Sequence, residues 1–229
     1  MLAFFFCGAL CTAGSLSEFS EVAARAGYTT QVFELDTNPF TANHPRDLTR
    51  YRDAIVGAIS KDPDSARIYF GYSAGSKFAA SLASEVDTAV DGLFLLDPVD
   101  GPPPIQKNFI RFPVFLENIS PNWRQLRPKD TNARQSVFKI LNTELGERAG
   151  FGGVPCVSEK YGHRWFARRM GAQANETFEL KEAGHLDPLS RQPGFPGNMA
   201  CPAGSKDAAK EARERALEQF SQFLAEIDF

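Results

Sequence analysis

The feature that most constrains the fold of this chain is a five-residue run, Gly71-Tyr-Ser-Ala-Gly75. It follows an apolar segment, residues 67–70, which is typical of a buried strand, and it precedes a small-residue segment, residues 76–83, with a helical pattern. A Gly-x-Ser-x-Gly run between a strand and a helix is typical of a strained turn that presents its serine hydroxyl beyond the sheet. We therefore expect Ser73 to be a nucleophile; the alternative is an ordinary turn residue.

Strands and helices alternate along the rest of the chain. We expect strands at residues 2–6, 30–35, 67–70, 93–96, 114–116 and 177–180, and helices at 16–26, 48–59, 76–83 and 205–229. This alternation predicts an α/β fold with a mostly parallel central sheet and helices on both of its faces. The 229 residues suffice for one such domain. Cap or loop insertions are expected around residues 101–112, 120–160 and 188–205.

Charge and hydropathy exclude two classes of protein. A formal net charge of -3 leaves no basic surplus for phosphates, so we expect no nucleic-acid partner. No apolar run approaches the roughly 18 residues that would span a bilayer, although peripheral contact with a membrane stays open. The twenty phenylalanines predict an apolar core. The sequence does not indicate an oligomeric state.

The first 14 residues allow two interpretations. They fit either a buried strand at residues 2–6 or the apolar core of a signal peptide. No Lys or Arg occurs before Arg25, so the positive segment of a signal peptide is missing and the strand is favoured.

A serine nucleophile needs a histidine base, and the chain has only three histidines. In folds with this serine turn, the chain order is serine, acid, histidine. His185 follows the last expected strand and is our candidate base. We interpret His44 and His163 as surface or capping residues.

The acid that orients the base is expected at Asp97, directly after the strand at residues 93–96. Asp100, Glu117 and Asp130 remain as alternatives. A role as a turn residue before Pro98 would also explain Asp97.

Two backbone N–H groups are needed to stabilise a tetrahedral oxyanion. One is expected from Ala74, directly after the serine, and the other from Ala9 or Leu10 in the loop after the first strand. Gly8 would let that loop approach closely. Candidate substrate contacts are Tyr72, Phe109 and Phe112.

The four cysteines do not follow a zinc-binding spacing, and we expect neither a metal nor a cofactor. Cys156 and Cys201 could form one disulfide or could both be free. Cys7 could also be a thiol nucleophile, but no histidine follows at a suitable place, and we interpret it as a loop residue.

Several short motifs together resemble those of chlorophyllases, a plant and algal branch of the α/β-hydrolases. Residues 4–8 resemble the L-F-L-H-G strand and loop of that family, and residues 162–166 its N-H-x-x-F motif. Leu95-Leu-Asp-Pro-Val-Asp-Gly101 is close to its I-D-P-V-D-G stretch, and residues 184–189 resemble G-H-M-D-M-L. The motifs occur in the family's order over nearly the whole chain.

The resemblance implies an α/β-hydrolase fold in an N-terminally minimal form, with Ser73, Asp97 and His185 as a catalytic triad. It implies hydrolysis of the phytyl ester of chlorophyll without a cofactor, in the chloroplast or cytoplasm rather than outside the cell. A general carboxylesterase or lipase acting on apolar esters is the alternative, and a non-catalytic relative that binds an apolar ligand is another. The chain departs from the family at the serine turn, usually G-H-S-R-G-G, and at Cys7, where the family has histidine.

Overall fold

The computed structural model describes residues 1–9, 11–35, 44–100, 114–126, 136–148, 156–157, 160–192, 201 and 203–227. Within them, six strands pair in parallel in the order β2-β1-β3-β4-β5-β6. The strands are β1 (Leu2–Phe6), β2 (Thr29–Phe33), β3 (Arg67–Tyr72), β4 (Gly92–Leu96), β5 (Val137–Thr143) and β6 (Thr177–Leu180). Because all six run in the same direction, their carboxyl ends lie at one edge of the sheet.

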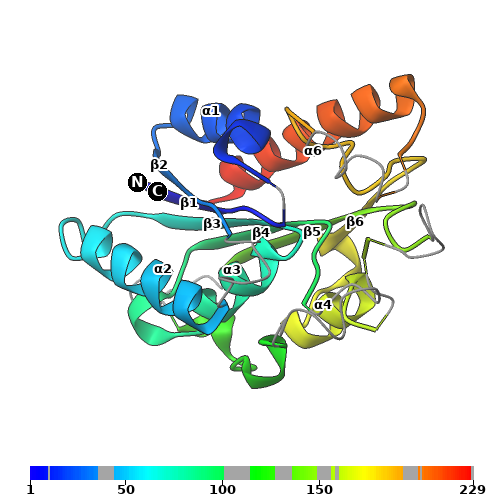
Figure 1. Cartoon of the computed structure of the whole chain (residues 1–229). Coiled ribbons are helices and arrows are strands. Elements are labelled where there is room, and N and C mark those ends of the chain that lie inside the picture. Colours follow the sequence, from blue (N-terminus) through cyan, green and yellow to red (C-terminus); the bar gives the residue numbers. More distant parts are fainter. Residues whose placement is uncertain are drawn as a thin grey trace.

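Helices cover both faces of this sheet (Figure 1). One face carries α1 (Ser17–Arg25) and α6 (Lys206–Glu226). The other carries α2 (His44–Ile59), α3 (Gly75–Ala83) and α4 (His163–Met170). The predicted α/β fold with helices on both faces is confirmed.

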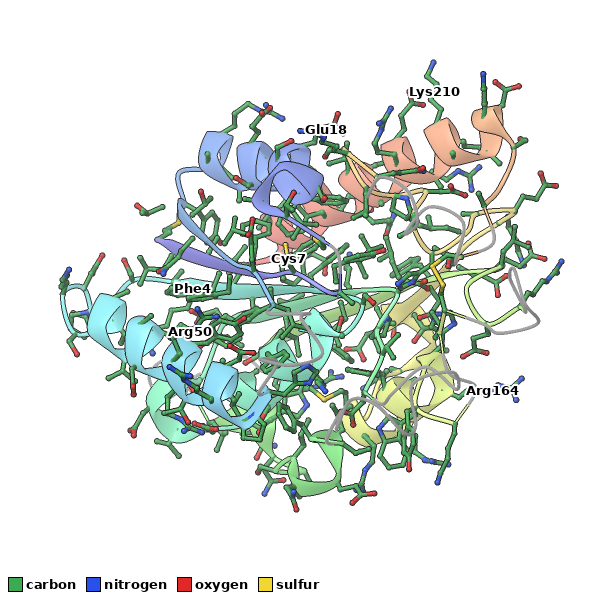
Figure 2. The ribbon with its side chains drawn as sticks, in the orientation of Figure 1. Phe4, Cys7, Glu18, Arg50, Arg164 and Lys210 are labelled. Carbon is green, nitrogen blue, oxygen red and sulfur yellow. A yellow bond between two sulfur atoms is a disulfide. The ribbon has the colours of Figure 1, made fainter. Side chains whose placement is uncertain are left out.

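Alternating side chains of β1 supply two separate cores. Phe5 packs in the cluster beneath α1 and α6, together with Phe220 of α6, whereas Phe4 and Phe6 pack in the cluster on the α2 side. Figure 2 labels Phe4 and Cys7, which belong to these two different clusters. Burying one phenylalanine side chain stabilises a fold by about 1.5–3 kcal/mol. The Phe-rich core is confirmed, and it explains why β1 is apolar on both faces.

The strand predicted at residues 114–116 is wrong. The structure has a 3-10 turn at Leu116–Asn118 instead. The backbone N–H groups of Phe115 and Leu116 donate to the carboxylate of Asp100, at 2.8 and 2.9 Å, rather than to a neighbouring strand.

The fifth strand lies where we expected a loop or cap. β5 (Val137–Thr143) pairs with β4 and β6 in the interior of the sheet order. Its sequence includes Lys139, which interrupts the apolar pattern. That side chain is buried, with its ammonium 2.5 Å from the carboxylate of Glu226 on α6, so the charge is neutralised by a distant residue.

The C-terminal helix begins as predicted. Ser205 is its N-cap and accepts a hydrogen bond from the N–H of Ala208 at 3.1 Å. Just before it, Cys201 forms a disulfide with Cys156, which decides between the two states that the sequence allowed. In the described ranges, no helix is both long and apolar enough to cross a membrane.

Candidate active site

The loop between β3 and α3 holds Ser73 in a left-handed backbone conformation, with φ of 51°. Its N–H donates to the carbonyl of Leu96 at 3.0 Å, and its carbonyl accepts from the N–H of Val99 at 3.1 Å. Gly75 lies so close to β1 that a Cβ there would be 2.1 Å from the carbonyl oxygen of Phe6. Non-glycine residues rarely adopt such a φ, so the turn is held by its neighbours.

Ser73 meets His185, which lies in the loop after β6. Nε2 of His185 is 2.9 Å from Oγ of Ser73, and Nδ1 is 2.5 Å from Oδ2 of Asp97. The exposed fractions are 6% for Ser73, 5% for His185 and 0% for Asp97, so the hydrogen-bonded chain is largely shielded from water. The structure therefore brings the predicted serine, base and acid together in one line.

Asp97 follows β4 and also has a positive φ, 46°. The backbone N–H of Thr143 donates to its Oδ1 at 2.7 Å, and the Thr143 hydroxyl donates to its Oδ2 at 2.8 Å. Burial alone would raise the pKa of Asp97, but the charges and hydrogen bonds of His163 and His185 outweigh it and hold the pKa well below its usual value. The acid is thus kept ionised.

The other acids predicted as alternatives lie elsewhere. Asp100 is buried and bonded to the backbone of the 3-10 turn and to the indole N–H of Trp165 at 2.9 Å. Glu117 is exposed on that same turn. Asp130 lies outside the described residues.

The interpretation of His44 and His163 as surface or capping residues is wrong. His44 begins α2, is 1% exposed and packs on Phe78. His163 begins α4, but its side chain is buried, and its Nε2 lies 2.6 Å from Oδ1 of Asp97. Sequence reasoning missed this residue and Thr143. Both residues are far from Asp97 in the sequence and contact it only in the folded chain. Thr143 is the last residue of β5, so recognising that strand would have placed Thr143 at the same sheet edge as Asp97.

The loop after β1 packs directly on Ser73. A Cβ added at Gly8 would lie 2.5 Å from Cβ and 3.0 Å from Oγ of Ser73. In the described part of the chain, the backbone N–H groups of Ala74 and Ala9 donate no hydrogen bond to another backbone carbonyl. Leu10, the other candidate for the second donor, lies outside the described residues.

The substrate contact predicted for Tyr72 is wrong. Tyr72 is 1% exposed, its ring stacks on that of His185, and its hydroxyl donates to the His185 carbonyl at 2.8 Å. Phe109 and Phe112, the other predicted contacts, lie outside the described residues. Across the described ranges, no group of three or more His, Cys, Asp or Glu side chains is arranged to hold a metal ion.

A serine on a strand–turn–helix elbow, followed in the chain by an acid and a histidine at the carboxyl edge of a parallel sheet, is characteristic of the α/β-hydrolase fold. Solved structures have the same fold. A soluble variant of monoglyceride lipase from Saccharomyces cerevisiae is 9% identical with a TM-score of 0.60, covering 100% of this chain and 87% of the lipase.

Two further solved structures agree. The α/β-hydrolase MGS-M1 from a Medee basin deep-sea metagenome is 17% identical with a TM-score of 0.54, covering 96% of this chain and 84% of that enzyme. The esterase domain of a Rhodothermus marinus protein is 15% identical with a TM-score of 0.52, covering 97% of this chain and 86% of that domain. No family model and no curated protein matches the sequence. At these identities the likeness establishes the fold alone.

Proposed function

We propose that this protein is a serine hydrolase of carboxylic esters. The observation that carries the proposal is the hydrogen-bonded chain from Ser73 through His185 to Asp97 on a strained elbow. A folded protein gains nothing in stability from a serine held at positive φ beside an imidazole and a buried carboxylate. Those features are needed to activate a hydroxyl for nucleophilic attack.

The proposed reaction has two halves. Ser73 Oγ attacks the ester carbonyl carbon while Nε2 of His185 takes its proton, and Asp97 stabilises the resulting imidazolium. The tetrahedral oxyanion accepts one hydrogen bond from the N–H of Ala74 and one from the N–H of Ala9 or Leu10. It collapses as His185 returns the proton to the leaving alcohol. Water, activated by His185, then cleaves the acyl-enzyme and releases the acid.

The substrate class is inferred from the structural relatives and from the sequence motifs. The structural relatives include an esterase domain and a monoglyceride lipase, which favour an apolar acyl ester. The motifs at residues 95–101 and 184–189 favour the phytyl ester of chlorophyll instead, through their resemblance to chlorophyllases. We propose an apolar ester as the common class and treat chlorophyll as one member to be tested.

The test compares the native protein with Ser73→Ala. Both are incubated with chlorophyll a, with p-nitrophenyl esters of increasing chain length, and with a fluorophosphonate probe that labels activated serines. We expect labelling and ester turnover in the native protein and neither in the variant, with equal thermal unfolding of the two. Chlorophyllide among the products would assign the phytyl ester; nitrophenol alone would assign acyl esters. A folded native protein without labelling or turnover would be a non-catalytic binder.

A further inference from the structure

Asp97 accepts hydrogen bonds from two imidazoles, those of His185 and His163. A single hydrogen bond, to His185, would be enough to orient the proposed base. His185 binds Oδ2 at 2.5 Å, and His163 binds Oδ1 at 2.6 Å. Thr143 supplies one more donor to each oxygen. The carboxylate is 0% exposed, so these four bonds replace its water shell. Two of the three histidines of the chain therefore share one buried negative charge.

A second carboxylate, that of Glu147, helps to hold His163 against Asp97. Its backbone N–H donates to the carboxylate of Glu147 at 3.1 Å, and its Nδ1 lies 3.5 Å from the same oxygen. Asp97 and Glu147 contact the ring, and Glu179 adds a more distant negative charge. Burial lowers the pKa of His163, but the attraction of these three carboxylates and the hydrogen bond to Asp97 outweigh it, and the net effect is a raised pKa.

We propose that His163 is a positioning residue that fixes Asp97 and, through its own protonation, limits how strongly Asp97 attracts the proton of His185. The proposal rests on the proposed function, because it concerns the base of that same site. When His163 is an imidazolium, its positive charge partly neutralises Asp97. A second imidazolium at His185 is then less stable, and His185 gives up its proton at lower pH.

The sign of the effect follows from this competition. His163→Gln retains an N–H donor for Asp97 but cannot carry charge. In that variant Asp97 attracts the proton of His185 more strongly, so the base becomes active only at higher pH, by about one pH unit. Thr143→Val is the matched control, since it removes a neutral donor from the same carboxylate and leaves the charge of His163 in place.

The first measurement needs no turnover. The ring signals of the histidines are titrated by NMR in the native chain and in the variants His163→Gln, Thr143→Val and His44→Gln. The His44→Gln variant identifies the signal of His44, the third histidine, which packs on Phe78. We expect the titration midpoint of His185 to rise by about one pH unit in His163→Gln, and to move much less in the two other variants. Reciprocally, His185→Gln should raise the midpoint of His163. Midpoints that do not depend on the other histidine would overturn the proposal.

The second measurement is the pH dependence of kcat/KM on the best p-nitrophenyl ester. We expect the acid limb of His163→Gln to move to higher pH by the same amount as the NMR midpoint, with KM unchanged. His163→Leu, which loses the donor as well, should lower kcat roughly ten- to a hundredfold; if it fails to fold, His163→Gln still decides. An unshifted acid limb in an active His163→Gln enzyme would overturn the proposal. Coupled midpoints in a protein that cleaves no ester would instead overturn the proposed function.

Discussion

Tyr72 and His185 are joined by two contacts across 113 residues of chain. The Tyr72 hydroxyl donates to the backbone carbonyl of His185 at 2.8 Å, and the two rings stack with centroids 5.2 Å apart. Tyr72 is the last residue of β3, directly before Ser73. The strand that leads into Ser73 therefore also holds the loop that carries His185.

Removing only the hydroxyl tests this link. In Tyr72→Phe the ring can still stack, but a buried carbonyl loses its donor, so we expect the free energy of unfolding to fall by about 1 kcal/mol. With the His185 loop less fixed, kcat should fall roughly three- to tenfold. Tyr69→Phe is the control, because Tyr69 lies on the same strand and donates to the Thr88 carbonyl at 2.7 Å. It should lose similar stability and keep its kcat; equal rates in both variants would contradict the link.

Gly8 sets the distance between the β1 loop and Ser73. In Gly8→Ala the new Cβ would lie 2.5 Å from Cβ of Ser73, so either the serine or the loop must move. We expect fluorophosphonate labelling to slow by roughly tenfold or more. Gly57→Ala, in α2 with nothing within 4 Å of the added Cβ, is the control. It should stabilise the chain by about 0.5–1 kcal/mol without changing the labelling rate.

We expect Lys77 to make the stability of the chain depend on pH. It is 1% exposed, with its ammonium 4.8 Å from the centroid of the Phe115 ring. Burial lowers the pKa of Lys77 from 10.5 to about 7, although the charge of Asp100 partly opposes this. Between these two values the unfolded chain binds a proton that the folded chain does not, so stability due to this residue rises with pH.

Lys77→Met removes this dependence. The unfolding free energy of the native chain minus that of the variant should increase from about pH 7 to pH 10, by up to about 1.4 kcal/mol per unit. Urea unfolding at several pH values measures it. Lys210→Met, at an exposed site on α6, should give a difference that stays constant with pH. A flat or falling difference for Lys77→Met would refute the buried-lysine explanation.

The disulfide joins residues separated by 45 positions, Cys156 and Cys201. Closing a loop of that length restricts the unfolded chain, so replacing both cysteines by serine should lower the free energy of unfolding by about 2–4 kcal/mol. Thermal unfolding with and without a thiol reductant gives a second measure: the native chain should lose stability on reduction and the double variant should not. Equal stability of the native chain and the variant would show that this link contributes nothing.

Local sequence was sufficient for most of the fold. Apolar runs predict β1, β3 and β4 because these strands are buried on both faces, and the glycines around Ser73 predict the elbow because only hydrogen fits there. The same patterns predict Asp97 as the acid and His185 as the base, since both follow strands that end at one edge of the sheet.

Other features depend on residues far apart in the chain. The sequence of β5 looks polar because it contains Lys139. That side chain can be buried only because Glu226, 87 positions away, neutralises its charge. Asp97 and Asp100 follow the same strand, and only the folded chain turns Asp97 toward His185 and Asp100 toward Phe115. His163 reaches Asp97 across 66 positions. Hydrophobic burial acts through short periodic patterns and is readable in sequence. Hydrogen bonds and charge pairs depend on the direction of single side chains, which tertiary packing alone decides.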